Sequence, residues 1–365
     1  MTESFPLPDA APDGYVRAQV FVEEAPALAC STVLPAHFRP VRAPVKVPGR
    51  DRLIGTLGTF RDPDDKRPVE VEIVCGWLER EVSPADWLGG LLRMLDAEVV
   101  HRRDLPREKG GDAVDLLTRR AVGGDTFVSR WSVHKEGRND GAHVFAVEAR
   151  ARSDVYADAA ESLALAAGGF APDAPSAWPY AERLKGIGRG QPGDFHTYYP
   201  LSWKAGELPA EDGTQKIVVD REVGGEVLAQ IELRVGVDLT PDELTSMYLL
   251  PMAERGLAPE LAPLAERAPF GGLEAAWETR GTAAPSDHRG APPIDLHLTL
   301  GTRGPVTYLF GLFGPSRALA PDLAAVHERA YGTVLEQLVT ADVSAREPGG
   351  EDGGEGEEPE GGGAE

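Results

Sequence analysis

Cysteine is nearly absent from this sequence of 365 residues. The two cysteines, Cys30 and Cys75, cannot build a disulfide framework, and no C-x-x-C pair indicates a zinc or redox site. We therefore expect both to behave as small buried hydrophobic residues.

Long apolar runs are absent as well. No stretch reaches the roughly 18 apolar residues that a membrane-spanning helix needs, and the first residues, Met1–Pro8, have neither the basic nor the apolar region of a secretory signal. We expect a cytoplasmic protein that is not integral to a membrane. With 42% hydrophobic and 26% charged residues the chain can bury a proper core, and its length favours two domains.

Basic residues are few compared with acidic ones, 37 Lys and Arg against 59 Asp and Glu, for a formal charge of −22. Eight of the acids and no base lie in 347–365, which leaves −14 for the remainder. A Gly/Glu-rich segment cannot bury apolar surface, so residues 346–365 are predicted to be a disordered acidic tail. Because binding of nucleic acid depends on Lys and Arg at phosphates, the acidic remainder argues against a nucleic-acid partner.

Constellations for catalysis or metal binding are also missing. The sequence contains neither H-E-x-x-H nor a G-x-S-x-G elbow. The glycines of 186–190 lack a preceding strand and the rest of a phosphate-loop pattern, and Asp62, Asp64 and Asp65 do not have EF-hand spacing. We therefore predict no enzyme activity, no cofactor and no metal.

One polar pair leaves two interpretations open. Asp295 and His297 lie two residues apart, on the same face of a predicted strand. They could act as a ligand or base pair, whereas their alternation with Ile294, Leu296 and Leu298 favours a solvated polar face.

The segment Val69–Leu95 shows how the chain is built. It predicts a strand, a short turn and a helix that Ser83 caps, with Pro84 in the first helical position. A second version begins at Glu226 and has its helix cap at Thr240, followed by Pro241.

The two halves of the sequence carry the same series of elements. Each has a strand ending at a proline with an aromatic residue three positions later (Pro35 and Phe38, Pro200 and Trp203), then a hairpin and the capped helix. A Gly-Gly pair (110–111, 271–272), a three-stranded meander and a last helix follow. The meander strands are predicted at Ala113–Arg120, Thr126–His134 and Ala142–Arg150, and again at Leu273–Arg280, Ile294–Thr302 and Val306–Phe313.

This order predicts an α+β protein with two repeated domains, each an antiparallel sheet with helices packed on it. The domains are predicted at 1–170 and 194–345. The Pro-, Gly- and Ala-rich interval 171–193 is predicted as the linker.

The repeated unit resembles the PsbP-like (Mog-type) α/β sandwich. The residues that carry the resemblance are Tyr199-Pro200-Leu201-Ser202-Trp203 and the two capped helices. Together with the start Phe5-Pro6-Leu7-Pro8 and the acidic composition, the chain is similar to the effector-associated chaperone family of type VI secretion. The resemblance implies a protein that holds apolar membrane-spanning segments of toxins on an open sheet face, usually as a homodimer. Two units in one chain would replace that homodimer by a covalent pseudo-dimer, so we expect a monomer.

The candidate client-binding residues are apolar. Tyr308, Phe310 and Leu312 share one face of a strand, and Leu309 and Phe313 occupy its other face. In the first half, Phe127 and Trp131 share a strand face. Either helices and the partner domain cover both faces, or one face remains as an apolar groove.

These observations favour a non-enzymatic chaperone or adaptor that binds an apolar helix of a client protein, such as a secreted toxin. Two other functions stay open. One is a structural or interaction scaffold with no ligand groove, and the other is a small-molecule carrier or enzyme that uses the inter-domain cleft around Asp295, His297 and His196.

Overall fold

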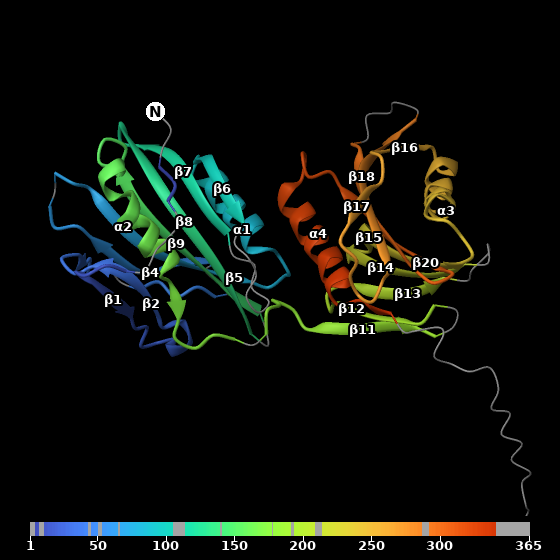
Figure 1. Cartoon of the computed structure of the whole chain (residues 1–365), viewed down its shortest axis with the longest axis horizontal. Coiled ribbons are helices and arrows are strands. Elements are labelled where there is room, and N and C mark those ends of the chain that lie inside the picture. Colours follow the sequence, from blue (N-terminus) through green and yellow to red (C-terminus); the bar gives the residue numbers. More distant parts are fainter. Residues whose placement is uncertain are drawn as a thin grey trace, which may run out of the picture.

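The chain folds into two successive units in the computed structural model (Figure 1). The structure describes residues 4–6, 11–42, 45–49, 53–64, 66–104, 114–138, 141–176, 178–190, 193–208, 214–286 and 292–340. The predicted acidic tail and the Gly110-Gly111 pair lie outside the described residues.

The first unit is built on an antiparallel sheet with the strand order β3-β4-β5-β9-β8-β7-β6. A small sheet, β1-β2-β10, accompanies it, as do a short 3-10 helix (Pro26–Leu28) and two α-helices. The elements are β1 (Tyr15–Val20), β2 (Cys30–Pro35), β3 (Arg39–Pro40), β4 (Ile54–Arg61), β5 (Val69–Leu78), α1 (Pro84–Met94), β6 (Glu98–Asp104), β7 (Val114–Val122), β8 (Asp125–Arg138), β9 (Gly141–Arg152), α2 (Tyr156–Gly168) and β10 (Ala171–Pro172).

The second unit repeats this plan with the strand order β13-β14-β15-β20-β19-β18-β16, β17 also pairing with β18. Its small sheet has the order β11-β12-β21. The elements are β11 (Leu184–Arg189), β12 (Phe195–Pro200), β13 (Lys204–Leu208), β14 (Gln215–Val223), β15 (Glu226–Val237), α3 (Pro241–Glu254), β16 (Leu257–Leu261), β17 (Ala265–Arg267), β18 (Ala275–Pro285), β19 (Ile294–Arg303), β20 (Val306–Pro315), α4 (Pro321–Glu336) and β21 (Val339–Thr340).

Equivalent hydrogen bonds in the two units show that they share one fold. The buried hydroxyl of Thr32 donates to the Ala166 carbonyl of α2, and that of Thr197 donates to the Val334 carbonyl of α4. After the strand-ending prolines, the amides of Phe38 and Trp203 donate to the carbonyls of Pro35 and Pro200, at 3.0 Å in both cases. The predicted α+β fold of two repeated domains, each an antiparallel sheet with helices, is confirmed.

The two predicted helix caps are present. Ser83 Oγ accepts the amide of Asp86 at 3.1 Å at the start of α1. Thr240 and Glu243 form a reciprocal capping box at the start of α3, with Thr240 Oγ1 accepting the Glu243 amide at 3.2 Å. The prediction that Cys30 and Cys75 are buried is also confirmed, and both are free.

The interval predicted as the linker, 171–193, contains structure that belongs to both units. Its first strand, β10, pairs with β2, and β11 pairs with β12 along its whole length. The connection between the units is therefore shorter than predicted and runs from 173 to 183. Composition alone missed these strands because β10 has only two residues and β11 is rich in glycine.

Both faces of each large sheet carry a helix. In the first unit α2 and the small sheet pack on one face, where Phe145 and Val147 are buried, and α1 covers Trp131 and Val133 on the other. In the second unit α4 and the small sheet cover one face, and α3 covers the other. The helices differ in placement. Helix α2 packs on β9, β2 and β8, whereas α4 packs on β20 and β12, the counterparts of β9 and β2, and makes little close contact with β19, the counterpart of β8.

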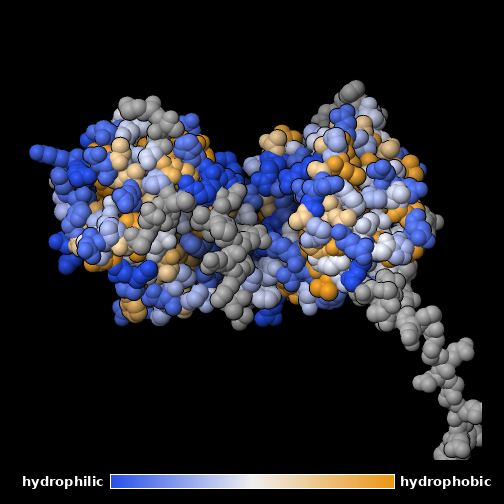
Figure 2. Space-filling model, in the orientation of Figure 1, coloured by the Kyte–Doolittle hydropathy of each residue, from blue (hydrophilic) through white to orange (hydrophobic). Residues whose placement is uncertain are grey.

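The two units meet through α1 and α4, which lie opposite each other in Figure 1. Arg93 pairs with Asp322, and Arg317 Nη1 lies 2.8 Å from Asp86 Oδ1. Hydrophilic residues line this junction on the face shown in Figure 2. A two-fold pair would bring equivalent elements together, whereas α1 corresponds to α3, not to α4. The predicted pseudo-dimer is therefore not two-fold in this structure.

Candidate functional site

Three of the predicted client-binding residues lie in the core of the second unit. Tyr308, Phe310 and Leu312 share one face of β20, as predicted, but their exposed fractions are 0%, 1% and 5%. The hydroxyl of Tyr331 on α4 donates to the Phe310 carbonyl at 2.8 Å, which shows how closely the helix covers this face. The opposite face, with Leu309, is buried under α3. The sequence left open whether both faces of this strand are covered or one remains as an apolar groove. In the structure both faces are covered.

The two candidates in the first unit are separated by their position along β8. Trp131 is buried under α1, and its Nε1 donates to Thr118 Oγ1 at 3.0 Å. Phe127 lies on the same sheet face, beyond α1, and is half-buried. It lines a cavity of about 250 Å³, which we call the Arg150 pocket.

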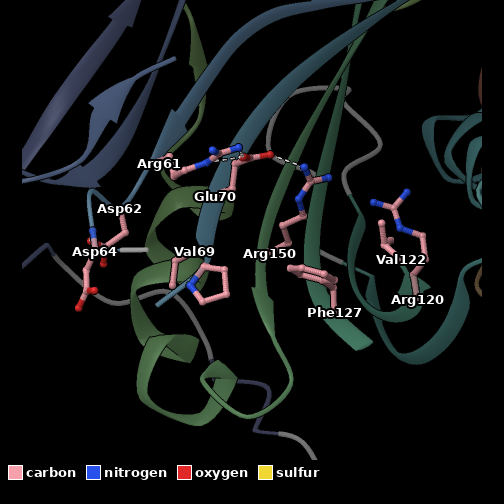
Figure 3. Close-up of a pocket in the computed structure, with 10 residues that line it drawn as sticks. Arg61, Asp62, Asp64, Val69, Glu70, Arg120, Val122, Phe127 and Arg150 are labelled. Atoms are coloured by element: carbon pink, nitrogen blue, oxygen red, sulfur yellow. Dashed lines mark hydrogen bonds and ion pairs between the residues drawn. The ribbon is translucent and has the colours of Figure 1, made fainter. Parts of the chain in front are cut away.

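Charged side chains dominate the Arg150 pocket (Figure 3). Arg61 and Arg150 reach Glu70 from opposite sides, with Arg61 Nε 2.9 Å from Glu70 Oε2. Glu148, directly behind, binds Arg150 Nη1 at 3.1 Å and Ser129 Oγ at 2.7 Å. The three arginines that line this pocket, Arg61, Arg120 and Arg150, are thus each paired with a carboxylate.

The carboxylate of Glu148, which binds Arg150, has a shifted pKa. Burial raises its pKa, and Arg150, Ser129 and Arg120 oppose that effect. A buried carboxylate with neighbouring cations often marks a site, but structural ion-pair networks give the same signature. The paired arginines leave little charge for a ligand, so we regard this pocket as a stabilising network.

A larger cavity, about 350 Å³, lies between α4 and the strands β18, β19 and β20. We call it the α4 pocket. It lies where α4 makes little close contact with β19, whereas α2 packs on the corresponding strand β8. Its lining consists of Arg280, Gly281, Thr282, Asp295, Leu296, His297, Leu312, Gly314, Pro315, Ala324, His327 and Glu328.

Two histidines bring polar atoms into this apolar cavity. His327 on α4 has an exposed fraction of 2%, and neither of its ring nitrogens has a hydrogen-bond partner among the described residues. The same is true of Nε2 of the half-buried His297. Burial lowers the pKa of both histidines to about 4, and nearby arginines add to the effect, so both rings are neutral at pH 7. Each neutral ring offers one donor and one acceptor.

The packing around His327 fixes its ring. Trp203 contacts it edge-on, with ring centroids 5.7 Å apart. A Cβ added to Gly314 would lie 3.2 Å from His327 Nδ1, so glycine at this position leaves the ring its room.

The rim of the α4 pocket reaches the first unit. The Asp295 carboxylate accepts the Arg317 amide at 2.7 Å, and Glu328 accepts the Arg317 guanidinium at 2.9 Å. Arg317 also binds Asp86 of α1, and these contacts raise its pKa. The pocket therefore lies beside the junction between the units.

The sequence identified part of this pocket. Asp295, His297 and Leu312 were singled out, although Asp295 and His297 line a cavity rather than the solvated face that alternation favoured. His196 is exposed on β12 and does not line the pocket. The sequence did not identify Arg280 or His327. A histidine at an apolar position of the last helix was the available signal for His327, because such a position is normally taken by a hydrophobic residue.

Within the described ranges there is no group of three or more His, Cys, Asp or Glu side chains that could hold a metal ion. None of the helices described is long and apolar enough to cross a membrane.

Comparisons with known proteins gave matches in solved structures alone. No family model matches the sequence, and no curated protein matches it. The similar structures include cyanobacterial PsbP from Synechocystis, with 14% identity, 43% of this chain and 92% of that chain covered, and a TM-score of 0.32. A mutant of the protein Mog1 has 12% identity, covers 44% of this chain and 98% of that chain, and has a TM-score of 0.31. The type VI secretion immunity protein TplEi from Pseudomonas aeruginosa, complexed with "L" peptide, has 13% identity, covers 90% of this chain and 98% of that chain, and has a TM-score of 0.22.

Proposed function

We propose that this protein is a non-enzymatic adaptor or chaperone that binds an apolar segment of a client protein in the α4 pocket. The observation that carries the proposal is the pocket itself, an open cavity with Leu296, Leu312, Pro315 and Ala324 in its lining. Ligand sites combine apolar walls with a few polar groups that fix orientation, and here His297, His327 and Arg280 supply those groups. We therefore place the proposed groove at the C-terminal end of β20, under α4, and not at the centre of the strand.

The client that we propose is a type VI secretion effector, on the strength of the resemblance in the sequence motifs. One apolar side chain buried from water contributes about 1.5–3 kcal/mol, so a segment that inserts one or two such side chains gains part of the binding free energy, and contacts outside the pocket must supply the rest. Binding would take place in the cytoplasm.

The first test is co-expression of the full chain with the effector encoded beside it. We expect a complex that survives purification. Thr282→Trp should abolish it, because Thr282 is exposed on β18 at the pocket, where an aromatic side chain fits a strand and fills the cavity.

Ala205→Trp is the matched control, because Ala205 is exposed on the edge strand β13 and does not line the pocket. It should leave the complex intact. A complex that both variants retain would move the docking site elsewhere, and the absence of any complex with the wild-type chain would overturn the adaptor function.

A further inference from the structure

The first unit holds a short piece of its own chain against the sheet face that α2 covers. Residues Ser4–Pro6 lie beside the start of α2 and against β6 and β8, and Phe5 packs on the core. The Phe5 ring lies under the guanidinium groups of Arg103 and Arg130, 4.2 and 4.6 Å from its centroid, and stacks on His101.

Three successive carbonyl groups hold this segment. Tyr156 Oη donates to the Ser4 carbonyl at 2.6 Å, Arg103 Nη2 to the Phe5 carbonyl at 2.8 Å, and Arg130 Nη1 to the Pro6 carbonyl at 2.5 Å. Arg130 is buried and is fixed by Asp115, whose Oδ1 lies 2.9 Å from its Nε. The first unit therefore has a built site for an extended segment with one aromatic side chain.

The α4 pocket is the counterpart of this site in the second unit. It lies on the face that the last helix covers, over the strands β18 and β19 that correspond to β7 and β8, and beside the first half of α4. The residues that fill the space differ. Tyr156 begins α2, whereas the small Ala324 lies near the start of α4 and lines the cavity.

We infer that the α4 pocket binds an extended peptide segment of the client, with an aromatic side chain in the cavity and backbone groups hydrogen-bonded to His297, His327 and Arg280. This inference rests on the proposed adaptor function and names the chemistry of its ligand. The segment takes the place that Ser4–Pro6 takes in the first unit.

The polar groups fit this ligand. The neutral imidazoles of His297 and His327 can donate to carbonyl groups or accept amide hydrogens of an extended backbone. Nε2 of His297 and both ring nitrogens of His327 have no hydrogen-bond partner among the described residues. Arg280 is exposed at the rim, where its guanidinium can lie over an aromatic face as Arg103 does over Phe5. Asp295 and Glu328 are engaged by Arg317 and so present less negative charge to the segment.

The test is fluorescence anisotropy with a labelled, end-blocked peptide, Thr-Glu-Ser-Phe-Pro-Leu-Pro, titrated with the full-length chain. We expect saturable binding that weakens about tenfold or more when the peptide's phenylalanine is replaced by alanine, because an aromatic side chain contributes most of the buried area. Thr282→Trp should remove binding, and Ala205→Trp should not. Circular dichroism of each variant checks that it is folded.

A second variant separates the backbone contacts from the cavity. His297→Leu keeps the cavity apolar and should still weaken binding of the peptide. If only Thr282→Trp weakens binding, the site recognises the aromatic side chain alone, and the extended-backbone part of the inference is overturned.

The remaining outcomes separate the peptide inference from the adaptor function. No binding, binding that Thr282→Trp leaves unchanged, or equally tight binding of N-acetyl-phenylalanine amide would overturn the peptide inference. A client complex without peptide binding leaves the adaptor function standing, and peptide binding without a client complex removes the adaptor function alone.

Discussion

The buried, neutral histidine His327 distinguishes the second unit from the first. His327 replaces what would ordinarily be an apolar residue on the inner face of α4, and it stays neutral because a charged ring in that position would lose its hydration. A buried polar group without partners costs about 1–3 kcal/mol. The protein carries that cost at a cavity, where a ligand can relieve it.

The lowered pKa of His327 predicts how stability depends on pH. Its pKa is about 4 in the folded protein, compared with the ordinary histidine value of 6.5, so the unfolded chain binds more protons between these values. The contribution is complete above pH 6.5 and is lost as the pH falls toward 4. We expect His327→Leu to lose less stability than the wild type between pH 7.5 and 4.5, by about 1–3 kcal/mol, measured by urea unfolding at both pH values.

Replacement of an exposed histidine is the control for this experiment. His196→Leu removes an imidazole from the surface of β12 and should leave the difference between the two pH values close to that of the wild type. If His327→Leu behaves in the same way as His196→Leu, the buried ring does not control the pH dependence.

At the scale of elements, the helix starts show how local the folding code is. Ser83 and Thr240 cap α1 and α3 with the same geometry, and each is followed by a proline whose missing amide needs no partner there. We predict that Ser83→Ala and Thr240→Ala each lower the free energy of unfolding by about 1 kcal/mol, and Thr240→Ala by somewhat more because it also breaks the capping box. Urea unfolding measures both.

Ser246→Ala on the exposed side of α3 is the control for the caps. Its hydroxyl donates to the Asp242 carbonyl inside the helix, a bond that helices do not need, so the change should be close to neutral. Equal losses for Ser246→Ala and Thr240→Ala would mean that the cap contributes nothing specific.

The same local rules explain which parts of the fold could be predicted. Caps, prolines and alternating apolar residues located both capped helices, the strand-ending prolines and the meander strands, because each signal lies within a few residues. The faces of β20 were assigned correctly from alternation. Whether Tyr308 and Phe310 are covered depends on where α4 packs, and residues far away along the chain decide that.

The α4 pocket was beyond local rules for the same reason. Arg280, His297, Leu312 and His327 come from four elements, and the space between them lies where α4 is displaced from β19. Nothing in the spacing of these residues specifies that displacement. The pairing of β10 with β2 likewise depends on a contact between two residues and a strand far away in the sequence, which local signals do not predict.

At the scale of the whole molecule, the two units are joined by polar contacts rather than by a shared core. The exposed pairs Arg93–Asp322 and Arg317–Asp86 contribute up to about 1 kcal/mol each. Polar interfaces between domains permit relative motion. Because Arg317 also contacts Asp295 and Glu328 at the rim of the α4 pocket, motion between the units would alter that rim.

The buried carboxylate of Glu81 is a further link in this junction. It is 1% exposed and binds Lys135 of the first unit at 2.5 Å, Arg329 of α4 at 3.0 Å and the Ala181 amide of the connection at 2.5 Å. Glu81→Gln removes the buried carboxylate that binds both Lys135 and Arg329, so we expect the free energy of unfolding to fall by about 3–5 kcal/mol. The units should also separate, which small-angle X-ray scattering would register as a larger radius of gyration. Glu254→Gln, at an exposed position at the end of α3, should change neither quantity. A Glu81→Gln protein that scatters and unfolds like the wild type would show that other contacts hold the junction.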